Sequence, residues 1–459
     1  MMRLLPWALF LLHALALGQE RRPNFVILLA DDLGWRDLAC SGSELHRTPR
    51  LDRLAREGVR FTQAYANAPN CAPSRACLMT GQLSPRHGVY TVGSAARGKA
   101  VNRQLVPTPN STVLPAANAT LAEMLAPEGY ACASIGKWHL GPSPALRGFE
   151  HAVAGNQAGH PKRYHSPYDN PDLPDGPEGE YLTDRMTEEA LAFLEQHREQ
   201  PFLLYLPYFA VHTPIQGRAD LVEAARERGL EGANYDAMVS AVDESVGRIL
   251  DALDALELAQ HTLVVFSSDN GGHARYTDMR PLRGSKGMLY EGGVRVPLIL
   301  RWPGRVEAGG LRSTPVQGSD LVPTLLELAR ASAPADHPLD GVSLLPLFAS
   351  PGGLAPRTLY WHFPAYLQGY LPEHGPWRTT PVGSLRAGRW KLLEFFEDGR
   401  LELYDLESDP GEERDLAAEQ PERVNQLHAE MRRWREALDA PVPTEREPRY
   451  QPAPAGADD

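Results

Sequence analysis

Residues 24–30 of the 459-residue chain read Asn-Phe-Val-Ile-Leu-Leu-Ala, a continuous apolar run followed directly by Asp31 and Asp32. A strand with one face in water alternates apolar and polar residues, whereas a strand buried on both faces is apolar throughout. The run therefore predicts a central strand of a parallel sheet. The two aspartates mark its carboxyl end, the edge at which open α/β sheets bind their ligands.

Further apolar runs cover residues 201–207, 262–267 and 296–301. Helical patterns separate them: residues 48–58 begin with Thr-Pro, a typical helix start, and residues 235–258 carry apolar side chains at helical spacing. Strands that alternate with helices predict an α/β fold, with a large, mostly parallel sheet flanked by helices.

The pattern changes near residue 350, where Pro351-Gly352-Gly353 opens a loop-rich stretch. Residues 384–393 and 400–406 flank Glu397-Asp398-Gly399 and predict a hairpin, and an amphipathic helix follows over residues 421–438. We therefore expect a catalytic domain over residues 19–350 and a smaller antiparallel α+β subdomain over residues 351–440. Residues 441–459, rich in Pro, Glu, Ala and Asp, predict a disordered tail.

Composition limits the class of partner. The chain has 58 Asp and Glu against 46 Lys and Arg, a formal charge of −12, which argues against a nucleic-acid or anionic-membrane binder. An anionic ligand would therefore need a local basic pocket. The cysteines, Cys40, Cys71, Cys77 and Cys132, are too few and too clustered to form a disulfide framework, although one disulfide among them is possible.

The N-terminus has the features of a secretory signal. Arg3 precedes an apolar run over residues 4–17, and Ala16-Leu17-Gly18 places small residues at the two positions that signal peptidase inspects. A membrane anchor is the alternative, but the run is shorter than the roughly 20 residues that span a bilayer. We expect residues 1–18 to be a cleaved signal peptide and the mature protein to be exported, periplasmic or secreted, without a stable membrane anchor.

The string Cys71-Ala72-Pro73-Ser74-Arg75-Ala76-Cys77-Leu78-Met79-Thr80-Gly81 is the most specific in the chain. Because Pro73 favours the first turn of a helix, Cys71 would lie at a helix N-terminus, where partial positive charge favours an anion. Arg75 adds a permanent positive charge. From chemistry alone, Cys71 is either an activated thiolate or a buried structural cysteine.

Oxygen donors gather at two strand ends. Asp31 and Asp32 follow the first strand, and Asp269 and Asn270 follow the strand predicted over residues 262–267. An Asp-Asp pair alone often caps a loop. Three carboxylates and one amide without histidine suit a hard cation, and Ca²⁺ better than Zn²⁺.

The Cys71 string resembles the formylglycine-dependent sulfatase motif C-x-P-S-R-x4-T-G at every fixed position, and the resemblance extends over roughly residues 24–438. It implies an alkaline phosphatase-like fold and a Ca²⁺ site formed by Asp31, Asp32, Cys71, Asp269 and Asn270. It also implies that a separate maturation enzyme converts Cys71 to Cα-formylglycine (3-oxoalanine), an aldehyde that hydrates to a geminal diol.

Three basic elements complete the resemblance: Gly136-Lys137-Trp138-His139-Leu140-Gly141, His212-Thr213-Pro214 and Gly284-Ser285-Lys286-Gly287. A lone His or Lys is usually structural or solvated, but each of these occupies a sulfatase context. The resemblance implies that Lys137 and Lys286 bind sulfate oxygens. It also implies that Arg75 and His139 position and deprotonate the diol, and that His212 protonates the departing alcohol.

The implied reaction is hydrolysis of a sulfate ester. One diol hydroxyl attacks sulfur to give a sulfated enzyme, and the second collapses to the aldehyde and expels sulfate. Residues 155–160 and 359–364 look like those of bacterial carbohydrate sulfatases, which suggests galactose or N-acetylgalactosamine sulfate as substrate. Trp361 and Phe363 could stack on a sugar or pack between the two domains.

Two alternatives remain from the sequence. A phosphatase or phosphonate monoester hydrolase shares the fold and sometimes the modified cysteine. A noncatalytic protein that binds sulfated glycans would keep Cys71 unmodified, but binding alone does not require His139 and His212 together.

Overall fold

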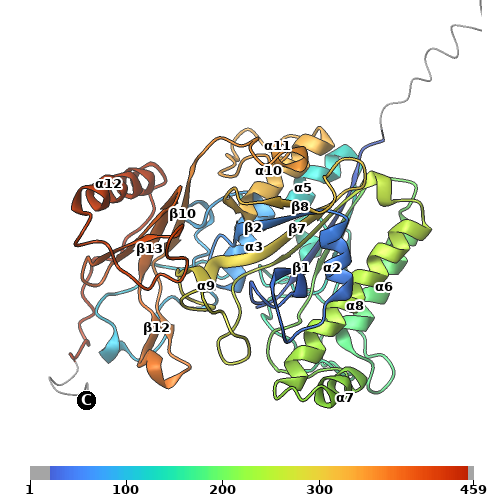
Figure 1. The fold of residues 1–459 in the computed structure, drawn as a ribbon, viewed down its shortest axis with the longest axis horizontal. Helices are drawn as coiled ribbons and strands as arrows, with labels where there is room; N and C mark the ends of the chain where they lie inside the picture. Colours follow the sequence, from blue (N-terminus) through green and yellow to red (C-terminus); the bar gives the residue numbers. More distant parts are fainter. Residues whose placement is uncertain (1–20, 453–459) are drawn as a thin grey trace, which may run out of the picture.

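A computed structural model describes residues 21–452, so the predicted signal peptide lies outside the described residues. The apolar run at residues 24–30 forms strand β1 (Asn24–Ala30), buried along its whole length. It lies inside a large mixed sheet that runs diagonally through Figure 1. In spatial order the sheet contains β4 (His151–Val153), β3 (Ala131–Ile135), β5 (Phe202–Pro207), β1, β6 (Thr262–Ser268), β7 (Arg295–Arg301), β2 (Val59–Tyr65) and β8 (Gly310–Arg312), and β9 (Val316–Gln317) also pairs with β2.

The half of the sheet around β1 is parallel. β1 pairs in parallel with β5 and with β6, and β3 pairs in parallel with β5 and with β4. β7 runs antiparallel to both β6 and β2. The fold is therefore the predicted mixed, mostly parallel α/β sheet, with its antiparallel pairs confined to β7.

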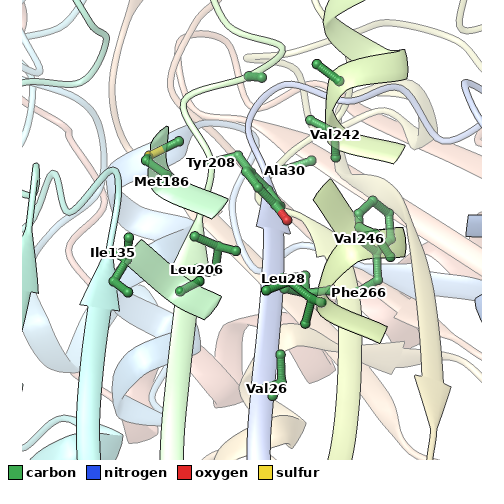
Figure 2. Packing of buried hydrophobic residues seen from close by; sticks show 14 of the residues in the cluster. Val26, Leu28, Ala30, Ile135, Met186, Leu206, Tyr208, Val242, Val246 and Phe266 are labelled. Carbon is green, nitrogen blue, oxygen red and sulfur yellow. The ribbon is translucent and has the colours of Figure 1, made fainter. Parts of the chain in front are cut away.

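Helices cover both faces of the sheet (Figure 1). One face packs against α2 (Pro49–Arg56), α6 (Leu182–Gln196) and α8 (Ala233–Ala255), and α7 (Ala219–Glu227) packs on α8. Figure 2 shows this core, in which Leu28 and Phe266 of neighbouring strands lie under Val246 of α8. The other face carries α3 (Cys71–Thr80), α5 (Leu121–Leu125), α10 (Leu321–Ala329) and α11 (Pro346–Ala349), with the short α4 (Ser84–His87) beside α3.

The C-terminal subdomain is built on a separate antiparallel sheet in the order β10 (Thr358–Phe363), β13 (Val382–Ala387), β14 (Trp390–Phe395) and β15 (Leu401–Asp405), against which α12 (Pro421–Ala437) packs. A two-stranded ribbon, β11 (Leu367–Gln368) and β12 (Trp377–Thr379), projects from it. The short helix α9 (Glu291–Val294) precedes β7 and lies next to this subdomain (Figure 1).

Two details differ from the sequence expectations. Residues 384–393 are not one strand, because Gly388, with φ of 59°, turns the chain between β13 and β14. Residues 441–452 are not a free tail. Their backbone bonds to the segment before α5 through Val106 N to Glu445 O and Glu447 N to Gln104 O, and Glu447 pairs with Arg103 at 3.2 Å.

The aromatic residues of β10 pack between the domains. Trp361 and Phe363 are buried in a cluster with Tyr65 of β2 and Val294 of α9, and the Trp361 indole N–H donates to the carbonyl of Ala66 at 2.8 Å. Of the two interpretations left open by the sequence, interdomain packing is therefore correct and sugar stacking is wrong.

Among the described residues, no helix is long and apolar enough to cross a membrane. All four cysteines are free thiols, so none of the possible disulfides forms.

Candidate active site

The site begins where β1 and β6 end side by side. Ala30 is in register with Ser268, so the residues that follow the two strands emerge together. The backbone N–H of Asp32 donates to Asp269 Oδ1 at 3.2 Å, and the Asn270 amide donates to Asp32 Oδ1 at 2.8 Å. The four predicted oxygen-bearing residues thus lie at one point on the carboxyl edge of the sheet.

Cys71 is the first residue of α3, as the position of Pro73 predicts, and it is buried. Its Sγ lies 3.6 Å from Asp31 Oδ1 and 3.9 Å from Asp32 Oδ1. One turn later, the fully buried Arg75 donates from Nε to Asp269 Oδ2 at 2.8 Å and from Nη1 to the carbonyl of Lys137 at 2.9 Å. Its Nη2 has no hydrogen-bond partner among the described residues and lies 3.8 Å from Asp31 Oδ1.

Two lysines face the aspartates from opposite sides. Lys137 follows β3 and places Nζ 2.6 Å from Asp31 Oδ2, and Lys286 places Nζ 2.7 Å from Asp32 Oδ2. Burial opposes ionisation of Asp32, but the charges of Lys286, His212 and Lys137 together outweigh it and lower the pKa of this carboxyl below its usual range. Burial raises the pKa of Asp31 well above its usual value. The site is thus a compact group of alternating charges from which water is largely excluded.

His139 lies two residues after Lys137 and is buried. Burial and the charge of Lys137 lower its pKa well below the usual value, so the ring is neutral and can accept a proton. Its backbone has φ of 62°, a left-handed conformation that is uncommon outside glycine. A Cβ on Gly159 would lie 2.4 Å from His139 Cε1, so the neighbouring loop leaves room for the ring only because residue 159 is glycine.

His212 is only partly buried and faces the same carboxylates. Its Nε2 lies 3.6 Å from Asp32 Oδ2, and its Nδ1 lies 2.9 Å from the carbonyl of Thr213. If Nδ1–H donates to that carbonyl, Nε2 is the nitrogen that can hold and deliver a proton. Burial lowers the pKa of His212 as well.

The residues present fit a hard cation. Asp31, Asp32, Cys71 and His212 each offer a donor atom within 4.8 Å of the others. Asn270 Oδ1 is buried without a hydrogen-bond partner, an acceptor that a cation would satisfy. The two oxygens of Asp269 also accept hydrogen bonds, from Arg75 Nε and from the backbone N–H of Asp32.

Sequence reasoning missed two side chains beside this group. His273 follows Asp269-Asn270-Gly271-Gly272, and burial lowers its pKa to about 4, with Asp32, Lys286 and His212 among the charges it senses. His160 stacks on His212 with ring centroids 6.0 Å apart. Proximity to the Asp269 loop could have indicated His273, whereas His160 lies in the stretch 155–160 that resembles carbohydrate sulfatases, and only the fold shows its contact with His212.

A helix N-terminus with a potential nucleophile, three buried cations, two histidines and a cluster of carboxylates at the carboxyl edge of an α/β sheet define a hydrolase for esters of tetrahedral oxyanions. Either a sulfate or a phosphate ester satisfies this geometry.

Comparison with known proteins identifies the family. The sulfatase family model matches residues 23–331, and the model for the N-sulphoglucosamine sulphohydrolase C-terminal region matches residues 284–437. Steryl-sulfatase of Mus musculus is 35% identical over 95% of this chain and 83% of the relative. N-acetylgalactosamine-6-sulfatase of the same species is 35% identical over 76% of this chain and 71% of the relative.

A solved structure, Ps i-CgsB in complex with k-i-k-neocarrahexaose, superposes with a TM-score of 0.75 and 30% identity, covering 90% of this chain and 93% of that one. The chain therefore belongs to the sulfatase family and is a sulfatase with the alkaline phosphatase-like fold.

Proposed function

We propose that this protein is an exported sulfatase that removes sulfate from a sulfated carbohydrate, with Cys71 converted to formylglycine by a separate maturation enzyme and with Ca²⁺ as cofactor. The observation that carries the proposal is the position of Cys71 at the start of α3, with Lys137, Lys286 and Arg75 around the carboxylates that face it. A structural cysteine needs none of these charges.

The cation would be held by the set that the family motif implies: Asp31, Asp32, residue 71, Asp269 and Asn270. When bound, calcium would neutralise charge on the sulfate group, and formylglycine would supply the nucleophile that a thiol cannot. The buried, unpartnered Asn270 Oδ1 supports this assignment.

The chain's own residues would bind the ester and move its protons. Lys137 and Lys286 bind sulfate oxygens in a buried setting, where electrostatic interactions are strong. Arg75, whose Nη2 makes no hydrogen bond within the described residues, would orient residue 71.

Proton transfer would fall to the two histidines. His139, neutral beside three cations, accepts a proton at residue 71. His212, the most exposed member of the group, delivers a proton from Nε2 to the departing alcohol.

The substrate class rests on the relatives. N-acetylgalactosamine-6-sulfatase and the carrageenan-oligosaccharide complex support a sulfated sugar, and galactose or N-acetylgalactosamine sulfate is the first candidate. Steryl-sulfatase is a relative of equal identity, so a steroid sulfate belongs in the same test.

Export is part of the proposal. Residues 1–18 would be removed as a signal peptide, and N-terminal sequencing of the exported protein would then begin at Gln19.

The test compares kcat/KM of the matured enzyme for sulfated galactose and N-acetylgalactosamine isomers, a steroid sulfate, and the sulfate and phosphate esters of one chromogenic phenol. We expect sulfate release, with a sulfated sugar as the best substrate. Preference for the phosphate ester would instead establish a phosphatase. Binding of sulfated sugars without turnover by matured protein would establish a noncatalytic glycan-binding protein.

A further inference from the structure

We call the proposed sulfate-binding group Cys71, Lys137 and Lys286 the sulfate pocket. Two arginines lie beside it without a carboxylate partner. Arg97 comes from the loop before α5 and Arg378 from β12, and no ion pair within residues 21–452 includes either. Several other buried or half-buried arginines pair with carboxylates, as Arg75 does with Asp269, Arg103 with Glu447 and Arg147 with Glu123. The buried Arg386 instead bonds Tyr65 and Gln63, and Arg97 Nη2 donates to the carbonyl of Val92 at 2.6 Å. Two unneutralised, half-buried guanidinium groups are costly in a folded protein unless a ligand compensates them.

The fold holds these two arginines together. The loop before α5 pairs with the β11–β12 ribbon: Tyr366 N donates to Ala95 O at 3.1 Å, and the Trp377 indole donates to Asn102 O at 3.0 Å. A Cβ on Gly98 would lie only 2.4 Å from the Trp377 ring. Arg97 and Arg378 are therefore fixed on two segments in close contact.

Arg378 packs directly against the loop that carries Lys286. A Cβ on Gly287, the next residue, would lie 2.5 Å from Arg378 Nε. The guanidinium also stands over the ring of Tyr370, 4.5 Å from its centroid, and the Tyr370 hydroxyl lies 2.9 Å from Ser285 Oγ. Arg378 thus packs against the loop that carries Lys286 and against Tyr370, a surface that borders the site.

Tyr370 also stacks on His273, with ring centroids 4.2 Å apart, so the surface continues to the loop after Asn270. We call Arg97, His273, Tyr370 and Arg378 the arginine shelf. Arg378 Nε is buried without a hydrogen-bond partner, which leaves a donor unsatisfied within the shelf. Burial lowers the pKa of both arginines, and the charge of Arg378 lowers that of Arg97 further.

We propose that the arginine shelf binds a second oxyanion on the substrate, a sulfate or a carboxylate next to the ester that is cleaved. This inference rests on the proposed function and narrows it: the preferred substrate is a multiply anionic glycan rather than a sugar with one sulfate. The planar fork of an arginine side chain fits either oxyanion through two parallel hydrogen bonds.

The test uses the matured full-length enzyme and three related disaccharides that share one scissile sulfate. The first carries no other charge, the second carries a further sulfate, and the third carries a uronate carboxylate. Because charge-assisted hydrogen bonds are strong, we expect kcat/KM to be at least about tenfold higher for the second or the third disaccharide than for the first. Whichever of the two is preferred identifies the oxyanion.

Arg97→Gln and Arg378→Gln should each reduce this preference at least about fivefold, and Arg378→Lys, which keeps the charge and loses the fork, should reduce it less. Arg433→Gln, on the exposed side of α12, changes the net charge equally and should leave the preference unchanged. Thermal melting would verify that each variant is folded.

Equal kcat/KM for all three disaccharides, or folded arginine variants with an unchanged preference, would overturn the inference while the sulfatase activity stands. Failure of the wild-type enzyme to release sulfate from any compound would instead overturn the proposed function.

Discussion

Cys71 is surrounded by more fixed charge than a buried thiol requires. Arg75 Nη2 lies 3.8 Å from Asp31 Oδ1, Lys137 pairs with the same Asp31, and Lys286 pairs with Asp32. Cys71→Ala should therefore reduce sulfate release to background while the protein remains folded, because the nucleophile is lost and the surrounding ion pairs persist. Steady-state kinetics and circular dichroism provide the measurement.

Cys77 is the matched control for Cys71, since it lies in the same helix and is equally buried, but contacts Ser84 and His87 instead of the aspartates. Cys77→Ala should keep most of the activity at some cost in stability. Substantial turnover by Cys71→Ala would contradict the assignment of residue 71 as nucleophile.

Gly159 provides a second residue-scale test. A methyl group at residue 159 would collide with the His139 ring, so Gly159→Ala should displace this histidine and lower kcat by about tenfold to a hundredfold. Gly352→Ala, where a Cβ meets nothing within 4 Å, is the control and should behave as wild type. If Gly159→Ala retains full kcat, His139 does not act in the reaction.

At this scale the sequence predicts the residues that share a motif and misses those that meet across the fold. The Cys71 string and the residues after β1 and β6 are local patterns, and the structure brings them together. Arg378 carries no local signal, and the resemblance of residues 155–160 to other sulfatases does not show that Gly159 contacts His139, because each contact joins segments remote in the chain.

Among the elements, α2 shows how tertiary contacts replace a local signal. Thr48 looks like its N-cap, yet the Thr48 side chain makes no cap hydrogen bond to the helix. Instead Asp243 of α8 accepts from Leu51 N at 2.7 Å and from Arg50 N at 3.0 Å. The helix boundaries were predictable from Pro49, whereas the partner that satisfies its free N–H groups was not.

Asp243 gives this contact a pH dependence. Burial raises the pKa of its carboxyl from an ordinary 3.8 to about 7, against the opposing effect of the two backbone N–H groups. Between these values the folded protein retains a proton that the unfolded chain has released, so the free energy of unfolding falls as pH rises. Asp243→Asn cannot ionise at residue 243. Between about pH 4 and about pH 8 its free energy of unfolding should therefore fall less than that of the wild type, by a difference on the order of 1–3 kcal/mol.

Urea unfolding of both proteins at several pH values checks the expected difference. Asp251→Asn, on the exposed side of the same helix, should keep the wild-type pH dependence. Parallel stability curves for wild type and Asp243→Asn would show that Asp243 is ionised throughout this range.

At the scale of the whole molecule, the two domains share a buried hydrophobic interface. Trp361 is 1% exposed and fills the space between β10 and β2, so Trp361→Ala should lower the free energy of unfolding by about 3–5 kcal/mol. Trp434 is half-buried on α12 and stacks on Tyr360, so Trp434→Ala should lower the free energy of unfolding by less than Trp361→Ala does. Chemical denaturation measures both, and a loss below about 1 kcal/mol for Trp361→Ala would contradict its role in joining the domains.

Most of the architecture was predictable from continuous apolar runs, because a strand buried on both faces leaves a clear pattern in the sequence. The ordered segment at residues 441–452 was not predictable, since its order depends on bonds to residues 101–106, more than three hundred positions earlier. The net charge of −12 likewise indicates neither the sulfate pocket nor the arginine shelf, because the fold brings together basic residues that are far apart in the sequence.

In the proposed mechanism, turnover depends on an aldehyde at position 71. Peptide mass spectrometry of active enzyme tests it most directly, performed on preparations matured to different extents. We expect the Cys71 peptide to be lighter by about 18 Da, as replacement of the thiol and one hydrogen by an aldehyde oxygen requires, and activity to rise in proportion to the modified fraction. Full activity from protein whose Cys71 is wholly unmodified would contradict the account.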